Sequence, residues 1–488
     1  MAASGSGRGV PSRLFTRRQT LRVAGAAGVV ASGAVLAACS AGGAASQAAP
    51  AVAPQVTVIP FQLWTPSVPT NKTTTQLIQQ FTDSSFNSKQ KGVRATWVGG
   101  GGMQTVATSL LAGASNFPWV VASCCGDWPI IQPFLAKLDP FFKTDNIDPT
   151  TTWQAGQLTR FQQPDGTYGL PEDAASDAYL YRQDILDGLG LAYPDPTWTS
   201  TDATNLWTAC AGKISGGWRY GVGCPFGQGT TEGLPTVVAG FGGQFQSQDR
   251  TQCLLNSPKA IAAGEYWMNL VWNKIGTGGD GSPVPGIFNG TCVFTTGAEP
   301  TIIQAVEQLG EHTKWDFVPW PSFPAGPVGK LHDNFYGMVT AAPQQELAWE
   351  LLKWAAIDPD WQRFYMQLAL APPAVASLLE EWYAIMRATA PVLQNKQLEY
   401  WGNATLQGVG VYDYEFFEYS PSQANNLVSS WWSQIWGQTV SVTAGFTQLA
   451  QQINALEAQA AVSAGALAQN IKAFPTNGPN LAPAVPGI

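Results

Sequence analysis

Short apolar runs alternate with stretches of helical spacing along most of the chain. Residues 56–64 form an apolar run typical of a buried strand. Leu77, Ile78 and Phe81 then place apolar side chains on one face of a predicted helix over 75–86. A β-α-β-α-β order predicts a mostly parallel sheet in an α/β domain. The segments that complete this order are strand 92–98, helix 103–112 and strand 119–123.

Later helices are marked by their ends. A serine or aspartate before a proline predicts a helix start, because the side chain accepts hydrogen bonds from free N–H groups and proline fits the first turn. The chain has this pair at Ser257-Pro258, Asp358-Pro359 and Ser420-Pro421. Residues 466–488 lose periodicity and are predicted to be a loosely ordered tail. One apolar stripe before the tail predicts a long amphipathic helix through Phe446, Leu449, Ile453, Leu456 and Ala460.

The N-terminal segment is predicted to direct export. Residues 1–22 contain five arginines, including the pair Arg17-Arg18, and no acidic residue; the apolar run 23–38 is short for a membrane-spanning helix. It ends in Leu-Ala-Ala before Cys39. This order is typical of a twin-arginine signal peptide over 1–38 and a bacterial lipobox, with Cys39 lipidated as the first mature residue. An uncleaved membrane anchor is the alternative.

The predicted location follows from this signal. Residues 39–54 are rich in Ala, Gly and Ser and predict a flexible tether. We expect the mature protein on the outer face of the bacterial cytoplasmic membrane, held by lipid alone. Removal of 1–38 takes away five arginines and changes the net charge from −8 to −13. An acidic body is repelled by anionic headgroups, so it should stand off the membrane.

Composition excludes several function classes. Hydrophobic residues make up 45% of the chain, which excludes whole-chain disorder, and the negative net charge argues against nucleic-acid binding. The chain has only two histidines, His312 and His332, both predicted to lie on the surface or in loops. A multi-histidine metal site is therefore excluded, no G-x-S-x-G occurs, and no cofactor or metal is predicted.

Six cysteines remain after Cys39. Export permits disulfides among them, but the sequence does not choose between the 15 pairings that six cysteines allow. No C-x-x-C pair occurs, which argues against zinc. The six are Cys124, Cys125, Cys210, Cys224, Cys253 and Cys292.

Four blocks of sequence, spread over about 56–460, resemble a known family. They are the first strand and its helix; Tyr168-Gly169-Leu170-Pro171 with 179–186, Gly190-Leu191 and Pro196-Thr197-Trp198; 288–294; and 315–321 with Gly337 and 348–354. In this order they resemble an extracellular solute-binding protein of the maltose-binding type, the capture subunit of a carbohydrate ABC importer. Arg182-Gln183 departs from the family's usual Asn-Lys.

The resemblance implies a fold of two α/β lobes with a ligand cleft between them and several hinge crossings. Mapped onto this chain, lobe one comprises 55–174 and 295–335, and lobe two comprises 175–294 and 336–465. The crossings are expected near 174–177, 294–295 and 335–337. The resemblance also implies a monomer, a carbohydrate ligand and ABC permease subunits as partners.

Candidate ligand residues are aromatic and polar side chains near strand ends. Rings cover the flat faces of a sugar, while carboxylates, amides and arginine bind its hydroxyls. A strand-end tryptophan is also a common core residue, so each assignment competes with a structural role. The candidates are Trp64, Asp127, Trp128, Trp218, Arg219, Glu299, Trp320, Asn334 and Tyr336.

Binding without catalysis is the function that the sequence favours, and no catalytic residue is assigned. A secreted glycoside hydrolase with two carboxylates is the alternative, because the chain has many acidic residues but no paired-carboxylate motif. A ligand-sensing lipoprotein would share the same fold. The sequence does not distinguish a sugar from a polyol or a sugar phosphate.

Overall fold

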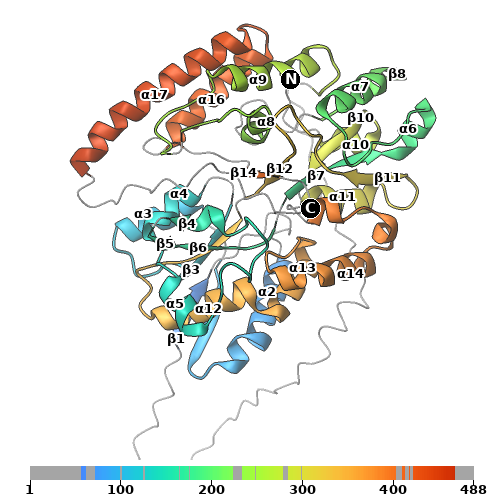
Figure 1. Cartoon of the computed structure of the whole chain (residues 1–488). Helices are drawn as coiled ribbons and strands as arrows, with labels where there is room; N and C mark the ends of the chain where they lie inside the picture. Colours follow the sequence, from blue (N-terminus) through green and yellow to red (C-terminus); the bar gives the residue numbers. More distant parts are fainter. Residues whose placement is uncertain are drawn as a thin grey trace, which may run out of the picture.

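The structure is a computed structural model with two sheets that lie in separate halves of the molecule (Figure 1). Among the described residues, no helix has the length and apolar character to cross a membrane. The described residues are 57–61, 72–98, 102–124, 127–163, 165–174, 176–223, 233–247, 249–277, 284–297, 299–332, 334–402, 409–412, 417 and 421–467.

The first sheet has five strands in the order β2-β1-β3-β13-β6. Strands β1 to β3 are mutually parallel, as their alternation with helices predicts, whereas β13 is antiparallel to both of its neighbours. The predicted strands and helices of this region are confirmed within a few residues at each end. The bounds are β1 (Thr57–Phe61), α2 (Lys72–Ser85), β2 (Val93–Trp97), α3 (Met103–Leu111), β3 (Val120–Ser123), β6 (Gly169–Pro171) and β13 (Phe335–Met338).

Helices from distant parts of the chain cover this sheet. In the lower half of Figure 1, α12 (Gln345–Ile357) and α13 (Pro359–Ala369) lie near α2. Phe81 of α2 stacks on Phe364 of α13 with ring centroids 4.3 Å apart. Asp358 caps α13 by accepting from the Asp360 and Trp361 N–H groups, which confirms that predicted start. The first lobe is therefore built from an early and a late segment of the chain.

The second sheet has seven strands in the order β14-β12-β7-β10-β9-β8, with β11 also pairing with β7. Its long strand β7 is antiparallel to β10, β11 and β12, while β9 and β10 are parallel. The bounds are β7 (Ser176–Arg182), β8 (Gly212–Ile214), β9 (Gly217–Val222), β10 (Cys292–Gly297), β11 (Trp315–Val318), β12 (Val328–Leu331) and β14 (Val409–Tyr412). A separate hairpin pairs β4 (Gln162–Gln163) with β5 (Gly166–Thr167).

Long helices pack on the second sheet. Helix α9 (Pro258–Trp272) starts at Ser257 as predicted, because the serine side chain accepts from the Ala260 N–H. Helix α17 (Val442–Leu467) carries the predicted apolar stripe only in part. The stripe is buried as far as Ile453, but the next buried residue is Glu457 rather than the predicted Leu456, which is only partly buried. The other helices of this half include α7 (Ser200–Cys210) and α16 (Pro421–Trp436); Ser420 and the tail from 468 on are outside the described residues.

The expected lobe boundaries are wrong in the second half of the chain. The segment 295–335, assigned to lobe one, instead contributes β11, β12 and the second half of β10 to the second sheet. Strand β13 then returns to the first sheet, followed by α12 and α13, so 336–374 belongs to lobe one. The crossings near 174–177 and 335–337 are confirmed. The one expected at 294–295 is absent from the described chain, because β10 stays in the second sheet, paired with β9 at Cys292 and Phe294 and with β7 from Phe294 to Gly297.

The third crossing lies after α13. Buried residues here alternate between two cores: Ala369, Ala371 and Ala374 pack in the core of the first sheet, whereas Leu370 and Val375 pack in a smaller core beneath β7 and β11. The smaller core also includes residues of α11 (Glu299–Gln308), α14 (Leu379–Thr389) and α15 (Glu399–Gly402). The remaining α-helices of the described residues are α4 (Trp128–Ile131), α5 (Asp139–Asp145), α6 (Gln183–Leu189), α8 (Leu234–Gly240) and α10 (Val284–Asn289).

Candidate functional site

Three chain segments that join the two sheets lie against one another. They connect β6 to β7, β12 to β13, and α13 to the helices that lead to β14. We call this region the junction. The Glu172 N–H donates to the Asn334 carbonyl at 3.1 Å, and the Ala174 N–H donates to the Pro372 carbonyl at 2.9 Å. The junction is thus a small three-stranded connection, and such connections are where two lobes can hinge.

A buried ion cluster sits where β7 begins. Asp177 accepts from Lys330 Nζ at 2.9 Å on one carboxylate oxygen and contacts His332 Nε2 at 2.8 Å on the other. The Asp177 and Lys330 side chains are only 2% and 3% exposed. Burial alone would raise the pKa of Asp177, but the ammonium and imidazole outweigh it and hold that pKa below its usual value. The carboxylate therefore stays charged and fixed, which suits a structural role rather than proton transfer.

The side-chain amide of Asn334 links the segment between β12 and β13 to the segment between β6 and β7. Asn334 Nδ2 donates to both carboxylate oxygens of Asp173, at 3.0 Å each. The third segment is held by Gln154, whose backbone N–H donates to the Ala374 carbonyl and whose side chain donates to the Pro373 carbonyl. Asn334 was expected to bind ligand; the structure instead places its amide within the junction.

Asp127 and Trp128 follow the end of β3, next to β13. The Asp127 carboxylate accepts from the Ser123 hydroxyl. Burial raises the pKa of Asp127, and the Ser123 hydroxyl and the Met103 N–H offset part of that rise. Trp128 is fully buried, with its ring about 5 Å from those of Phe161 and Phe335. Asp127 therefore remains a partly exposed carboxylate at the junction edge, while Trp128 is a core residue.

Trp320 and Tyr336 are also buried. Trp320 donates from Nε1 to the Asp177 carbonyl at 3.0 Å and packs on Tyr179 at 5.3 Å. Tyr336 is fully buried; burial first, and then the nearby Glu172 carboxylate, raises its pKa well above the usual value. Both side chains support the junction from inside, and neither ring presents a free face in this structure.

Trp218 and Arg219 lie at the far edge of the second sheet. They belong to the start of β9, whereas the end of β9 and the end of its parallel neighbour β10 point to the junction. Trp218 Nε1 donates to the Lys274 carbonyl at 2.8 Å, and Arg219 Nε donates to the Cys210 carbonyl at 2.8 Å. At about 3.3 Å per residue, the start of β9 is on the order of 15 Å from the junction edge. These two residues are separated from the other candidates.

The remaining candidates are placed only by their position in the chain. Trp64 and Cys39 lie outside the described residues. Glu299 is the first residue of α11, directly after the junction end of β10. Parallel strands carry ligands at their carboxyl ends, so this position is the expected one for a ligand residue.

Sequence reasoning missed the charged residues of the junction. Asp173 comes just after the short strand β6, and this signal could have identified it, whereas Asp177 is the second residue of β7. Lys330 and His332 carried no such signal, because their partner lies about 150 residues earlier. His332 lies in the loop after β12, as predicted, but its side chain is only 12% exposed and is held by Asp177. His312 is exposed as predicted.

The described cysteines divide into two groups, while Cys125 and Cys224 lie outside the described residues. Cys124, at the end of β3, is disulfide-bonded, whereas Cys210, Cys253 and Cys292 are free and buried. Burial raises the pKa of each of these three thiols to about 12, which keeps them unreactive. Within the described part of the chain, no three His, Cys, Asp or Glu side chains gather as they would around a metal ion.

Two interleaved α/β lobes joined by three crossings define the class of two-lobed, hinged binding proteins. The sequence profile described as bacterial extracellular solute-binding protein matches residues 64–358. This match covers more than half of the chain, and the protein belongs to that family. No curated protein sequence matches the chain.

Solved structures show the same fold. The ABC substrate-binding protein Lmo0181 of Listeria monocytogenes, in complex with cycloalternan, is 15% identical with a TM-score of 0.67, over 82% of this chain and 99% of that one. The cyclic alpha-maltosyl-1,6-maltose binding protein of Arthrobacter globiformis has 15% identity and a TM-score of 0.65 over the same shares. The sugar-binding protein MalE of Xanthomonas citri has 16% identity and a TM-score of 0.64, over 83% and 98%.

Proposed function

We propose that this protein captures a carbohydrate between its two lobes and delivers it, chemically intact, to an ABC importer. The observation that carries the proposal is the junction: three adjacent crossings allow the lobes to rotate as units, and the described strand ends of both sheets meet beside it. The sugar ligands named for the similar solved structures support the class of ligand.

The proposed ligand contacts are Asp127, beside the junction, and two candidates that come after strand ends in the chain. Asp127 offers a partly exposed carboxylate that could accept from a sugar hydroxyl. Trp64 and Glu299 follow the carboxyl ends of β1 and β10 and complete the proposal. Trp128, Trp320, Asn334 and Tyr336 act behind these residues, as supports of the junction. Trp218 and Arg219 have no part in it.

The proposal includes a lipid anchor at Cys39 and a twin-arginine export route, with the acidic body standing off the membrane. Cys39→Ala should move the protein from the membrane fraction to the soluble fraction, because the tether then carries no lipid. A protein that stays in the membrane with unchanged mobility would instead have residues 23–38 as an uncleaved anchor.

Two other functions are the alternatives. A glycoside hydrolase needs two available carboxylates; in the junction, Asp173 is held by Asn334 and Asp177 by Lys330 and His332, which disfavours those two as catalytic groups. A ligand-sensing lipoprotein would bind in the same way but act on a different partner. Loss of uptake of the ligand on deletion of the gene would favour import over sensing.

The test is a thermal-shift screen of the purified protein against a panel of mono- and oligosaccharides, polyols and sugar phosphates. A ligand at a hundred times its dissociation constant stabilises the folded form by about 2.7 kcal/mol. Asp127→Asn should weaken the response, while Trp218→Ala, at the far edge of the second sheet, serves as the matched control. Recovery of a cleaved ligand would show that the protein is a hydrolase rather than a binding protein. A loss of thermal shift in Trp218→Ala equal to that in Asp127→Asn would contradict the proposed site.

A further inference from the structure

Strand β2 forms one edge of the first sheet, and its outer side faces away from β1. Backbone groups alternate in direction along a strand. The Gly92 carbonyl and the Val98 N–H both bond to β1. The backbone N–H and C=O groups of the even-numbered residues therefore point toward β1, and those of Val93, Ala95 and Trp97 point away from it. Outward groups of an edge strand are a template for another strand.

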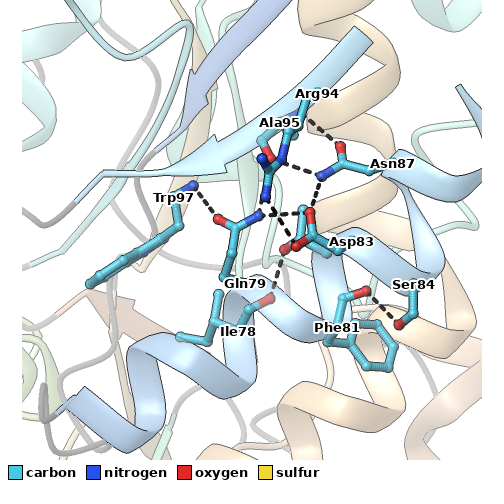
Figure 2. Close-up of polar contacts among 10 residues, drawn as sticks. Ile78, Gln79, Phe81, Asp83, Ser84, Asn87, Arg94, Ala95 and Trp97 are labelled. Carbon is cyan, nitrogen blue, oxygen red and sulfur yellow. Dashed lines mark hydrogen bonds and ion pairs between the residues drawn. The ribbon is translucent and has the colours of Figure 1, made fainter. Parts of the chain in front are cut away.

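Two side-chain amides occupy this outer side (Figure 2). Asn87 follows α2, in the short helix Asn87–Lys89, and bonds Ala95 twice: its Oδ1 accepts from the Ala95 N–H at 2.7 Å, and its Nδ2 donates to the Ala95 carbonyl at 3.0 Å. Gln79 of α2 accepts from the Trp97 N–H at 2.9 Å and donates to the Ala95 carbonyl at 3.3 Å. An amide side chain carries the same donor and acceptor as a peptide group, so the pair imitates a neighbouring strand.

A carboxylate holds both amides in place. Asp83 Oδ1 accepts from Asn87 Nδ2 at 2.7 Å and from Gln79 Nε2 at 3.1 Å, which fixes the nitrogen of each amide toward Asp83 and Ala95. Arg94 of β2 contacts the second oxygen of Asp83 at 3.3 Å. Figure 2 shows these contacts as one connected network between the helix and the strand. We call Gln79 and Asn87 the amide cap, and Asp83 its positioning residue.

We propose that the amide cap closes the edge of the first sheet against strand addition by a second copy of this chain. The second copy is the occupant that fits, because an edge strand can pair with its own twin about a two-fold axis. Residues 93–97, Val-Arg-Ala-Thr-Trp, contain no proline and are mostly of strand-forming types. Without the cap, Ala95 and Trp97 would offer three unpaired backbone groups in register.

The test combines hydrogen exchange with sedimentation velocity on the purified full chain. At low concentration, Asn87→Ala should accelerate exchange of the Ala95 amide and Gln79→Ala that of the Trp97 amide, each by about fivefold or more, because each loses its own acceptor. The double variant should form dimers as its concentration rises, and both amides should then regain protection. Gln80→Ala is the matched control, since it removes an exposed amide from the same helix.

Each result decides the proposal. Dimers whose Ala95 and Trp97 amides are protected support it. Fast exchange of both amides in a double variant that stays monomeric at every concentration would show that the edge accepts no strand. Unchanged exchange would show that the amides do not cap it, and equal association of Gln80→Ala would show that the association is nonspecific. If the double variant does not fold, the single variants give the same readings one amide at a time.

Discussion

Replacement of Lys330 by methionine tests whether the buried ion cluster holds the junction together. The change removes the ammonium 2.9 Å from Asp177 and keeps a side chain of similar length, while Asp177 remains buried. Loss of one partner of a buried ion pair costs about 3–5 kcal/mol, because the other charge stays buried. His332 still contacts the second carboxylate oxygen, so we expect about 3 kcal/mol, a large share of the roughly 5–15 kcal/mol of a typical domain.

Urea unfolding followed by tryptophan fluorescence measures this free energy. Lys314→Met is the matched control: Lys314 contacts Asp187 at the same 2.9 Å, but both side chains are exposed, so we expect no measurable change. Adding Asp177→Asn to Lys330→Met should restore part of the lost stability, because the uncompensated charge is then removed. The reasoning is refuted if Lys330→Met costs no more than the control, or if the double variant is as unstable as the single one.

Three further predictions concern pH, close packing and the core. The cationic partners of Asp177 hold its pKa below the usual value despite burial. The stabilisation that Asp177 provides is therefore complete above about pH 4 and is lost as the pH falls toward the lower pKa of the folded state. The unfolding free energies at pH 3 and pH 6 should differ less in Asp177→Asn than in the parent. Gly221→Ala places a Cβ 2.0 Å from a backbone carbonyl of α7 and should cost about 3 kcal/mol or prevent folding, whereas Gly217→Ala, with open space around it, should change the unfolding midpoint little. Trp128→Ala should cost about 3–5 kcal/mol and leave ligand affinity of the folded fraction unchanged, as measured by urea unfolding and titration calorimetry.

The sequence predicts the elements of the first sheet well because each one carries its own local signal. The apolar run of β3 is continuous because this central strand is buried on both faces of the sheet. Strand β1 buries Ile59 and Phe61 on one face. The caps at Ser257 and Asp358 mark helix starts through bonds within three residues. Such signals do not depend on the rest of the fold, and they hold for that reason.

The lobe boundaries depend on pairings between distant strands. Strands β10, β11 and β12 all pair with β7, whose first residue is more than a hundred positions earlier. Their residues suit either sheet, since both sheets bury apolar strands. The partner strand decides which sheet receives them, and a pairing between distant strands leaves no trace in local periodicity.

The same limit applies to the candidate ligand residues. Trp128, Trp320 and Trp218 all stand beside polar residues near strand ends, yet two are core residues and one is bonded to a loop carbonyl at the far edge. A tryptophan suits a buried site and a sugar platform equally, because both need a large flat apolar ring. Its neighbours in space, rather than those in sequence, decide between the two.

The polar character of the junction bears on how the lobes could close. Apolar packing between lobes would resist rotation, because any sliding opens gaps in a close-packed contact. The crossings are held instead by contacts between adjacent segments, such as Asn334 with Asp173 and Lys330 with Asp177. We expect these distances to change little if all three segments bend together, so that the contacts would keep the crossings in register. Under the proposed function, ligand binding would have to bend these polar crossings together with the short apolar segment 369–375, whose residues pack in two cores.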